Sequence, residues 1–195
     1  MSYCKYVKDL EKENVHKVYH DNFYGVNIKE DSEIFGRLIM EINQAGLSWN
    51  TILKKENNFR LAYNNFDIKK ISKYEEKETD RLMSDAGIIR NKLKIAAAIY
   101  NAKEVLKIQK ESESFLKWID TQNKIINKTI NENIKDGKIS SDKKLLEIKK
   151  SWVKVFKSRF KFVGGEIVGE FLMSLGYYKS PHSEDCKRFK KLNSF

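Results

Sequence analysis

The chain has 195 residues, and its 38 lysines and arginines against 27 aspartates and glutamates give a formal net charge of +11. This surplus favours a polyanionic partner such as DNA, RNA or a phospholipid surface, although a lysine-rich background of solvated helix faces produces the same count. No apolar run approaches the roughly 20 residues of a membrane span, and the N-terminus lacks the apolar core of a signal peptide, so we expect a cytoplasmic protein with no membrane partner.

Helix-forming residues dominate the composition, which includes a single proline and nine glycines. No convincing strand pair or hairpin signal appears, and the pattern therefore predicts an all-α fold. The length fits one compact unit over residues 1–195. Cys4 and Cys186 stand at opposite ends of the chain, and in a reducing cytosol we expect free thiols or metal ligands there and not a disulfide.

The first strongly patterned helix is expected over residues 31–45, with Asp31 or Ser32 as its cap. Its apolar stripe consists of Ile34, Phe35, Leu38, Ile42 and Ala45. Glu41 lies at the edge of that stripe, where burial of an unpaired carboxylate is costly. Gly46 is expected to end the helix.

The remaining chain reads as a series of helices with one long interruption. Helices are expected over about 49–64 after Ser48, after Asp67 in the turn 64–67, over 77–84, from about 91 onward, over 144–158, and within 160–178. The segment 123–146 is rich in lysine and asparagine and contains Gly137, so we expect a flexible loop there. The tail 179–195 is polar.

The stretch LMSDAGIIRNKLKI at residues 82–95 has the layout of a helix–hairpin–helix. Gly87 would let a phosphate approach the backbone amides, while Arg90, Lys92 and Lys94 would add attraction for DNA. An ordinary connection between two helices with solvated lysines has the same pattern, so this motif alone leaves both interpretations open.

Metal-capable residues occur near both ends of the chain. His182 and Cys186 are four residues apart, so one turn can aim both at one ion, and Cys4 and His20 lie near the other terminus. Together they would form a filled tetrahedral Zn²⁺ site of structural type. Cys4 and His20 are widely spaced and no CxxC motif is present, so four unrelated side chains are the alternative.

Aromatic residues gather in the first fifty positions, namely Tyr3, Tyr6, Tyr19, Phe23, Tyr24 and Trp49. Aromatic faces can sandwich a flat base, and a cationic base gains further attraction from them. Glu41 could then accept hydrogen bonds from the base and oppose its charge. Packing in the core is the alternative for each aromatic residue.

Together these residues resemble the 3-methyladenine DNA glycosylase I family of the helix–hairpin–helix superfamily. The matching segments, in the family's order, are Cys4, YHDNFYGV (19–26), EINQAGLSW (41–49), ILKKENNFR (52–60), FD (66–67), LMSDAGIIRNKLKI (82–95), FKFVG (160–164) and HSEDC (182–186). QAGLSW and DAGIIRN together are specific, and residues 103–150 match most poorly.

The resemblance implies a role for each matching segment. Glu41 would recognise the methylated adenine in a pocket formed by Tyr6, Tyr19, Tyr24 and Trp49. DNA contacts would come from Gln44, Gly46, Leu47, Gly87, Arg90, Lys92 and Lys94, with Gly46 and Leu47 probing the base stack. The zinc ligands would be Cys4, His20, His182 and Cys186. A region over about 31–110 would hold the hairpin, and a lobe from about 1–30 and 111–195 would hold the zinc.

The implied reaction is excision of 3-methyladenine from double-stranded alkylated DNA by a monomeric, monofunctional enzyme. Methylation at N3 makes the base a cationic leaving group, so the enzyme must flip the base and stabilise the oxocarbenium-like sugar while water attacks. No lysine is convincingly placed as a Schiff-base nucleophile, and Lys94 is expected to contact phosphate.

Several positions depart from the family pattern: Phe23 and Tyr24 replace an acidic residue and Trp, Tyr6 replaces a common Trp, His16 replaces Tyr, Gly165 and Glu166 replace a Pro-Thr or Thr-Thr pair, and VFKSR stands at 155–159. The altered segments FYGV (23–26) and FKFVGGEI (160–167) support one alternative, a non-catalytic protein of the same fold that binds damaged DNA. Another alternative is a zinc-stapled helical interaction domain with an incidental basic surface.

Overall fold

The computed structural model describes residues 2–26 and 28–192, and within these ranges the chain forms helices and turns without a strand. The elements are α1 (Tyr3–Lys8), α2 (Val15–Asn22), α3 (Asp31–Gln44), α4 (Trp49–Lys54), α5 (Glu56–Ala62), η1 (Asn64–Phe66), α6 (Ile68–Ile71), α7 (Glu76–Ser84), α8 (Lys92–Ser112), α9 (Phe115–Lys135), η2 (Ser141–Lys143), α10 (Lys144–Arg159), α11 (Gly165–Ser174) and α12 (Lys187–Leu192). The predicted all-α fold is confirmed for this part of the chain.

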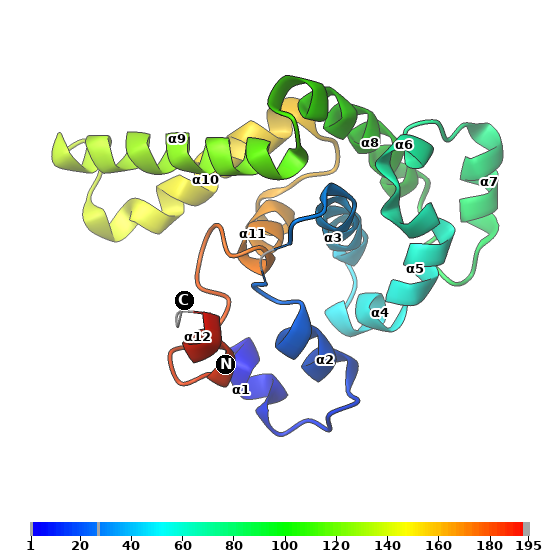
Figure 1. Ribbon diagram of the computed structural model, residues 1–195, viewed down its shortest axis with the longest axis horizontal. Helices are drawn as coiled ribbons and strands as arrows, with labels where there is room; N and C mark the ends of the chain where they lie inside the picture. Colours follow the sequence, from blue (N-terminus) through cyan, green and yellow to red (C-terminus); the bar gives the residue numbers. More distant parts are fainter. Residues whose placement is uncertain (1, 27, 193–195) are drawn as a thin grey trace.

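Helix α3 lies at the centre of the molecule and contacts α4, α5, α8, α9 and α11 (Figure 1). Ten of its fourteen residues are buried, including Phe35 and the carboxylate-bearing Glu41. Since α8 belongs to one predicted lobe and α9 and α11 to the other, α3 joins the two regions. The division into lobes stays a prediction.

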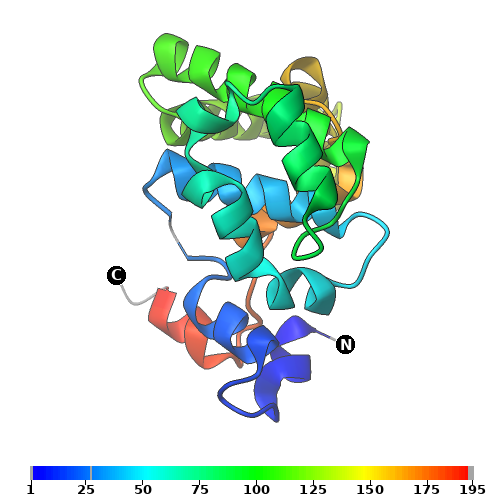
Figure 2. The same cartoon turned by 90° about the vertical axis from the view of Figure 1, so that its right-hand side faces the viewer.

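The two ends of the chain meet at one side of the molecule. Helices α1, α2 and α12 lie together, and both views of the ribbon show this grouping (Figures 1 and 2). The opposite side carries the long pair α9 and α10, which extends away from the centre. None of the described helices is long and apolar enough to cross a membrane.

Several expected helix boundaries are confirmed by side-chain caps. The Ser48 side chain accepts a hydrogen bond from the Thr51 amide at the start of α4, and Asp67 accepts one from the Lys70 amide at the start of α6. Gly46 follows the end of α3 with a φ of +79°, a left-handed conformation that glycine adopts without strain.

The expected cap of α3 was wrong, because Asp31 serves a different helix. The N-cap of α3 is Glu30, which makes no side-chain cap bond. The Asp31 carboxylate instead accepts hydrogen bonds from the amides of Phe115 and Leu116, which are the first residues of α9. A carboxylate is favoured at a helix N-terminus, so this long-range bond fixes α9 against α3.

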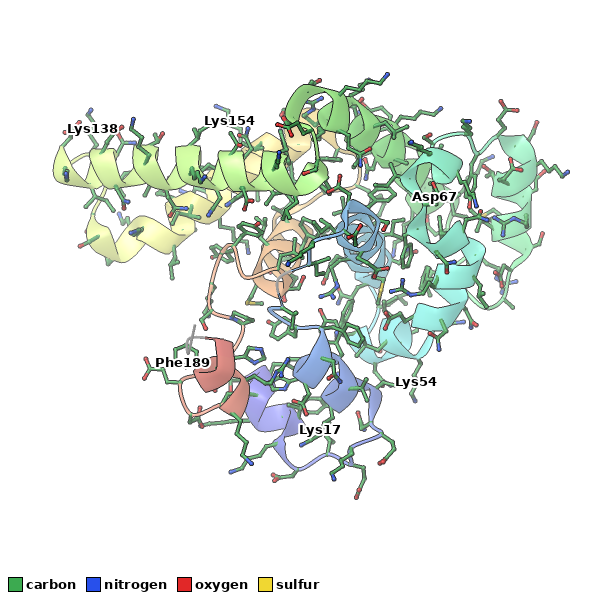
Figure 3. All side chains as sticks on the ribbon, viewed as in Figure 1. Lys17, Lys54, Asp67, Lys138, Lys154 and Phe189 are labelled. Atoms are coloured by element: carbon green, nitrogen blue, oxygen red, sulfur yellow. The ribbon has the colours of Figure 1, made fainter. Side chains whose placement is uncertain are left out.

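The expected flexible loop over residues 123–146 was also wrong for its first half, since α9 continues to Lys135. Ile126 and Ile130 are buried at helical spacing, and α9 packs along α10. Its lysines and asparagines occupy the outer face. Lys138, in the connection after α9, and Lys154, on α10, also project outward (Figure 3). A narrow buried stripe is enough to hold a polar helix in place.

The single helix expected over 49–64 is divided. It breaks at Lys55, the shared cap of α4 and α5, and the Lys55 ammonium donates to the carbonyls of Ala86 and Gly87. The helices expected over 77–84, from 91, over 144–158 and within 160–178 are confirmed as α7, α8, α10 and α11. The polar tail contains α12, and residues 193–195 lie outside the described residues.

Candidate functional site

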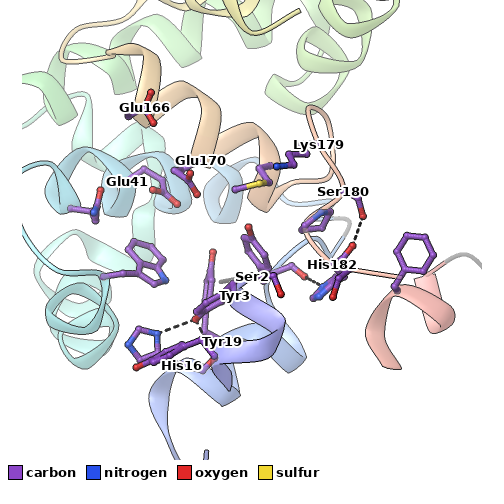
Figure 4. A pocket seen from close by; sticks show the side chains of 18 of the residues that line it. Ser2, Tyr3, His16, Tyr19, Glu41, Glu166, Glu170, Lys179, Ser180 and His182 are labelled. Carbon is purple, nitrogen blue, oxygen red and sulfur yellow. Dashed lines mark hydrogen bonds between the residues drawn. The ribbon is translucent and has the colours of Figure 1, made fainter. Parts of the chain in front are cut away.

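A cavity of about 1010 Å³ opens between α2, α3, α4, α11 and the segment that precedes α12 (Figure 4). Its aromatic lining includes Tyr3, Tyr6, Tyr19, Tyr24 and Trp49, and its acidic lining includes Glu41, Glu166 and Glu170. All four aromatic residues expected to bind a base therefore meet in one cavity with Glu41. Their roles toward a ligand stay predictions.

The aromatic walls are fixed by contacts among themselves. The rings of Tyr19 and Trp49 meet edge to face with centroids 5.2 Å apart, and Tyr24 lies 5.7 Å from Tyr19. Tyr19 is 4% exposed, and its hydroxyl accepts a hydrogen bond of 2.9 Å from Arg37 Nη1. Tyr6 is 48% exposed and thus lies at the mouth of the cavity.

The Glu41 side chain is 5% exposed at the wall of this cavity. Among residues 2–26 and 28–192, no hydrogen bond or salt bridge to its carboxylate is found. Burial raises the pKa of Glu41 to about 8, with the nearby Arg37 opposing this rise and Glu170 adding to it. A buried carboxylate without a partner is costly, so this group is suited to a ligand that supplies donors or positive charge.

Tyr3 and His16 form one wall near the mouth. Burial lowers the pKa of His16, and the Tyr3 hydroxyl lies 3.1 Å from its Nδ1 and donates to its backbone carbonyl at 3.3 Å. The departure at position 16 thus supports the position of Tyr3. Sequence reasoning did not assign Tyr3, Arg37 or Glu170 to the site. Arg37 lies four residues before Glu41 on α3, and Glu170 lies four residues after Glu166 on α11, so this spacing of charged residues could have indicated two of them.

At positions 23 and 24, which also depart from the family pattern, the backbone carbonyls make the contacts with Arg37 and His182. The Phe23 carbonyl accepts hydrogen bonds from the guanidinium of Arg37, and the Tyr24 carbonyl accepts one from His182. These bonds do not depend on the side chains at positions 23 and 24. Glu166 pairs with Lys149 at 2.7 Å, with its carboxylate largely in solvent.

The loop between α3 and α4 lies beside the cavity, because Gln44 and Trp49 both line it. Leu47 at its tip is 39% exposed, and a Cβ on Gly46 would meet no atom within 4 Å. Gln44 Nε2 donates to the Leu47 carbonyl at 3.1 Å and so stiffens the loop. Gln44, Gly46 and Leu47, the residues of this loop expected to contact DNA, therefore lie on one edge beside the cavity.

The connection between α7 and α8 forms the expected hairpin. The Gly87 amide donates to the Asp85 carboxylate at 2.7 Å, and an added Cβ at Gly87 would come within 2.9 Å of that oxygen and 3.2 Å of Asn58. Glycine is thus required by the packing of the hairpin as well as by any approach of phosphate. Arg90 and Lys92 are exposed beside it.

Lys94 is the exception among the expected phosphate contacts. It is 4% exposed, and its ammonium donates to the carbonyls of Asn43 at 2.9 Å and Ala45 at 2.7 Å. The charge compensates the last carbonyls of α3 and ties α8 to the loop that carries Leu47. The expected phosphate contact of Lys94 does not fit this position, because its donors are directed inward.

A second cluster joins the two ends of the chain. The donor atoms of Cys4, His20, His182 and Cys186 lie within 4.8 Å of one another, so the four residues could hold a metal ion. His20 Nε2 lies 3.4 Å from the Cys4 sulfur and 3.1 Å from His182 Nδ1. The Cys186 sulfur lies 3.7 Å from each of these two nitrogens.

Both histidines of the cluster are oriented by their other ring nitrogen. His20 Nδ1 donates to the Asp21 carboxylate at 2.7 Å, and His182 Nε2 donates to the Tyr24 carbonyl at 2.9 Å. In the neutral tautomer that these two bonds favour, the nitrogens that face the sulfurs carry the lone pairs that could bind a cation. The arrangement matches the donor set expected from the sequence.

The fold and the cavity define a helical protein with an aromatic cavity beside a buried carboxylate, an arrangement that suits a flat, electron-poor ring. The model of the family described as "Methyladenine glycosylase" matches residues 9–190. The chain belongs to this family.

Individual relatives agree with this assignment. The chain is 33% identical over 172 residues to "DNA-3-methyladenine glycosylase 1" of Escherichia coli (strain K12), covering 86% of this chain and 88% of the relative. It is 32% identical to "DNA-3-methyladenine glycosylase" of Haemophilus influenzae (strain ATCC 51907 / DSM 11121 / KW20 / Rd), covering 90% and 92%. Among solved structures, 3-methyladenine DNA glycosylase I from Staphylococcus aureus superposes with a TM-score of 0.70 at 29% identity, covering 91% of this chain and 92% of that chain.

Proposed function

We propose that this protein is a DNA glycosylase that hydrolyses the N-glycosidic bond of 3-methyladenine in alkylated DNA. The single observation that carries the proposal is the buried Glu41 carboxylate in an aromatic cavity, unpaired among the residues that the structure describes. Two relatives are named DNA-3-methyladenine glycosylases, and the Staphylococcus aureus structure is described as the structural basis of 3-methyladenine recognition. The same ligand class suits the present cavity.

The chemistry follows from the charge of the substrate. Methylation at N3 leaves adenine positively charged and weakens its bond to deoxyribose. A flipped base held against Trp49 and Tyr19 would place its positive edge beside Glu41, and the cation would favour the ionised carboxylate. When the bond breaks, its electrons neutralise the base, and water adds to the sugar carbon to leave an abasic site.

We propose that duplex DNA approaches across the edge formed by Leu47 and the hairpin at Gly87. Leu47 is apolar, exposed and next to the cavity, as a side chain that fills the gap left by a flipped base must be. Arg90 and Lys92 would contact phosphates beside it. We further propose that the protein is a cytoplasmic monomer, because no large apolar surface is expected from its lysine-rich sequence.

We propose Zn²⁺ as the ion of the Cys4–His20–His182–Cys186 cluster. Zinc bond lengths in a tetrahedron put neighbouring ligand atoms about 3.4–3.8 Å apart. Here the four donor pairs between a cysteine sulfur and a histidine nitrogen and the pair of histidine nitrogens are separated by 3.1–3.7 Å, and all donor atoms lie within 4.8 Å of one another. With four protein ligands no position remains for substrate, so the ion would be structural and hold α1 and α2 to the C-terminal segment.

The test is release of free bases from methylated duplex DNA, separated by chromatography, for wild type and Glu41→Gln. Release of 3-methyladenine that falls in the variant would support the proposal. Intact, salt-sensitive DNA binding without release would favour a non-catalytic damage-binding protein. Absence of DNA binding would favour the interaction-domain alternative.

A further inference from the structure

Glu170 brings a second carboxylate to the cavity from a different helix than Glu41. Glu170 lies on α11, which packs on α3, and both residues line the same cavity. Figure 4 shows the two carboxylates directed toward one another above the aromatic rings. In the part of the chain that the structure describes, neither carboxylate has a hydrogen bond or salt bridge.

The two carboxylates differ in depth. Glu41 is 5% exposed, whereas Glu170 is exposed to solvent. One turn before Glu170 on the same helix, Glu166 is drawn to Lys149 by an ion pair of 2.7 Å. Within the described part of the chain, Glu170 is therefore the acid without an ion pair that lies nearer the opening, while Lys149 and Lys179 are the cations whose charge reaches it.

Depth decides which part of a flipped nucleotide each acid meets. The base enters the cavity first, while the sugar stays attached to the DNA backbone and must remain at the opening. On this geometry, and resting on the proposed glycosylase function, we propose that Glu170 faces the deoxyribose and stabilises the positive charge that develops on its anomeric carbon. Glu41 faces the base.

The proposed step balances as follows. The bond from the anomeric carbon to the base nitrogen breaks, and its electron pair neutralises the methylated base. The sugar becomes a cation beside Glu170, a water oxygen bonds to the anomeric carbon, and the Glu170 carboxylate accepts the proton that this water loses. Although Glu170 is exposed as a residue, partial desolvation of its carboxyl group at the cavity and the charge of Glu166 raise its pKa, which suits it to this acceptor role.

The test uses the full-length protein and two duplexes that differ only at one abasic site. One carries a pyrrolidine, which is cationic at neutral pH, and the other carries an uncharged tetrahydrofuran. Wild type should bind the pyrrolidine duplex more tightly, and Glu170→Gln should reduce that preference by about tenfold with tetrahydrofuran binding unchanged. Glu170→Gln should also slow single-turnover release of 3-methyladenine from methylated DNA.

The matched control is Glu132→Gln, which removes the same charge from an exposed position on α9 and should keep the wild-type preference. Glu170→Asp retains the charge and should restore part of it. An unchanged preference in Glu170→Gln, with a wild-type melting curve, would overturn the inference. Wild-type protein that prefers pyrrolidine but releases no base would refute the glycosylase proposal while leaving the cation site standing.

Discussion

Burial of Glu41 should make the stability of this protein fall as the pH rises. The folded chain holds the Glu41 proton up to a pKa of about 8, whereas the ordinary value is 4.5. Between these two values the unfolded chain has released the proton and the folded chain has kept it. The folded state therefore binds more protons, and the free energy of unfolding decreases with pH across this window.

The size of the effect follows from the shift. Each pKa unit corresponds to about 1.4 kcal/mol. Between the ordinary value and pH 7 lie roughly 2.5 units, so at pH 7 the shift lowers the free energy of unfolding by about 3 kcal/mol relative to its value at low pH. Glu41→Gln removes the ionisable group while keeping its shape. The variant should be more stable than wild type at pH 8.5, and the advantage should shrink or vanish at pH 4.5.

The assay is urea unfolding of both proteins at several pH values, with the metal content kept equal. Burying an amide without a partner costs free energy at every pH, so the informative quantity is how the difference between the two proteins changes with pH. Glu132→Gln serves as the control, since its carboxylate is exposed and should give a nearly constant difference. A constant difference for Glu41→Gln would refute the reasoning, because it would mean that Glu41 is solvated.

Further predictions concern the pocket, the metal, the DNA-binding edge and the reaction product. Trp49→Ala should weaken binding of free 3-methyladenine by about 1–3 kcal/mol, the usual worth of one stacking face; unaltered affinity in a calorimetric titration would contradict this placement. Cys186→Ser should lose zinc in metal analysis and have a lower melting temperature. A wild-type protein that is equally stable without zinc would contradict the structural role of the metal site. Arg90→Ala should reduce the salt slope of DNA binding by about 1, while Lys94→Met should lower stability through the lost carbonyl bonds and leave the slope unchanged. Borohydride should trap no covalent DNA adduct during turnover, and an adduct that disappears in Lys179→Gln would identify that cavity lysine as a nucleophile and overturn the monofunctional mechanism.

The local pattern of the sequence was sufficient for most helices and caps. Ser48 and Asp67 cap the helices expected after them, because a cap bond joins residues only three positions apart. The helix over 123–135 was missed because its buried stripe is thin and its outer face is rich in asparagine and lysine. Packing against α10 supplies the stability that intrinsic propensity does not.

The site was predictable only as a set of residue types. The sequence indicated that Glu41, Trp49 and the metal-capable residues were unusual, and the family resemblance grouped them. The direction of a side chain depends on tertiary packing, which placed the Lys94 ammonium against the end of α3 and not toward solvent.

The sequence by itself thus determined the helical class, most element boundaries and the family to which the chain belongs, since these follow from patterns within short segments. Only the tertiary structure decided that Glu41 and Glu170 share a cavity and that the Lys94 ammonium is directed inward. The reason is physical: burial and charge–charge interaction depend on distances between residues far apart in the chain, which no local pattern contains.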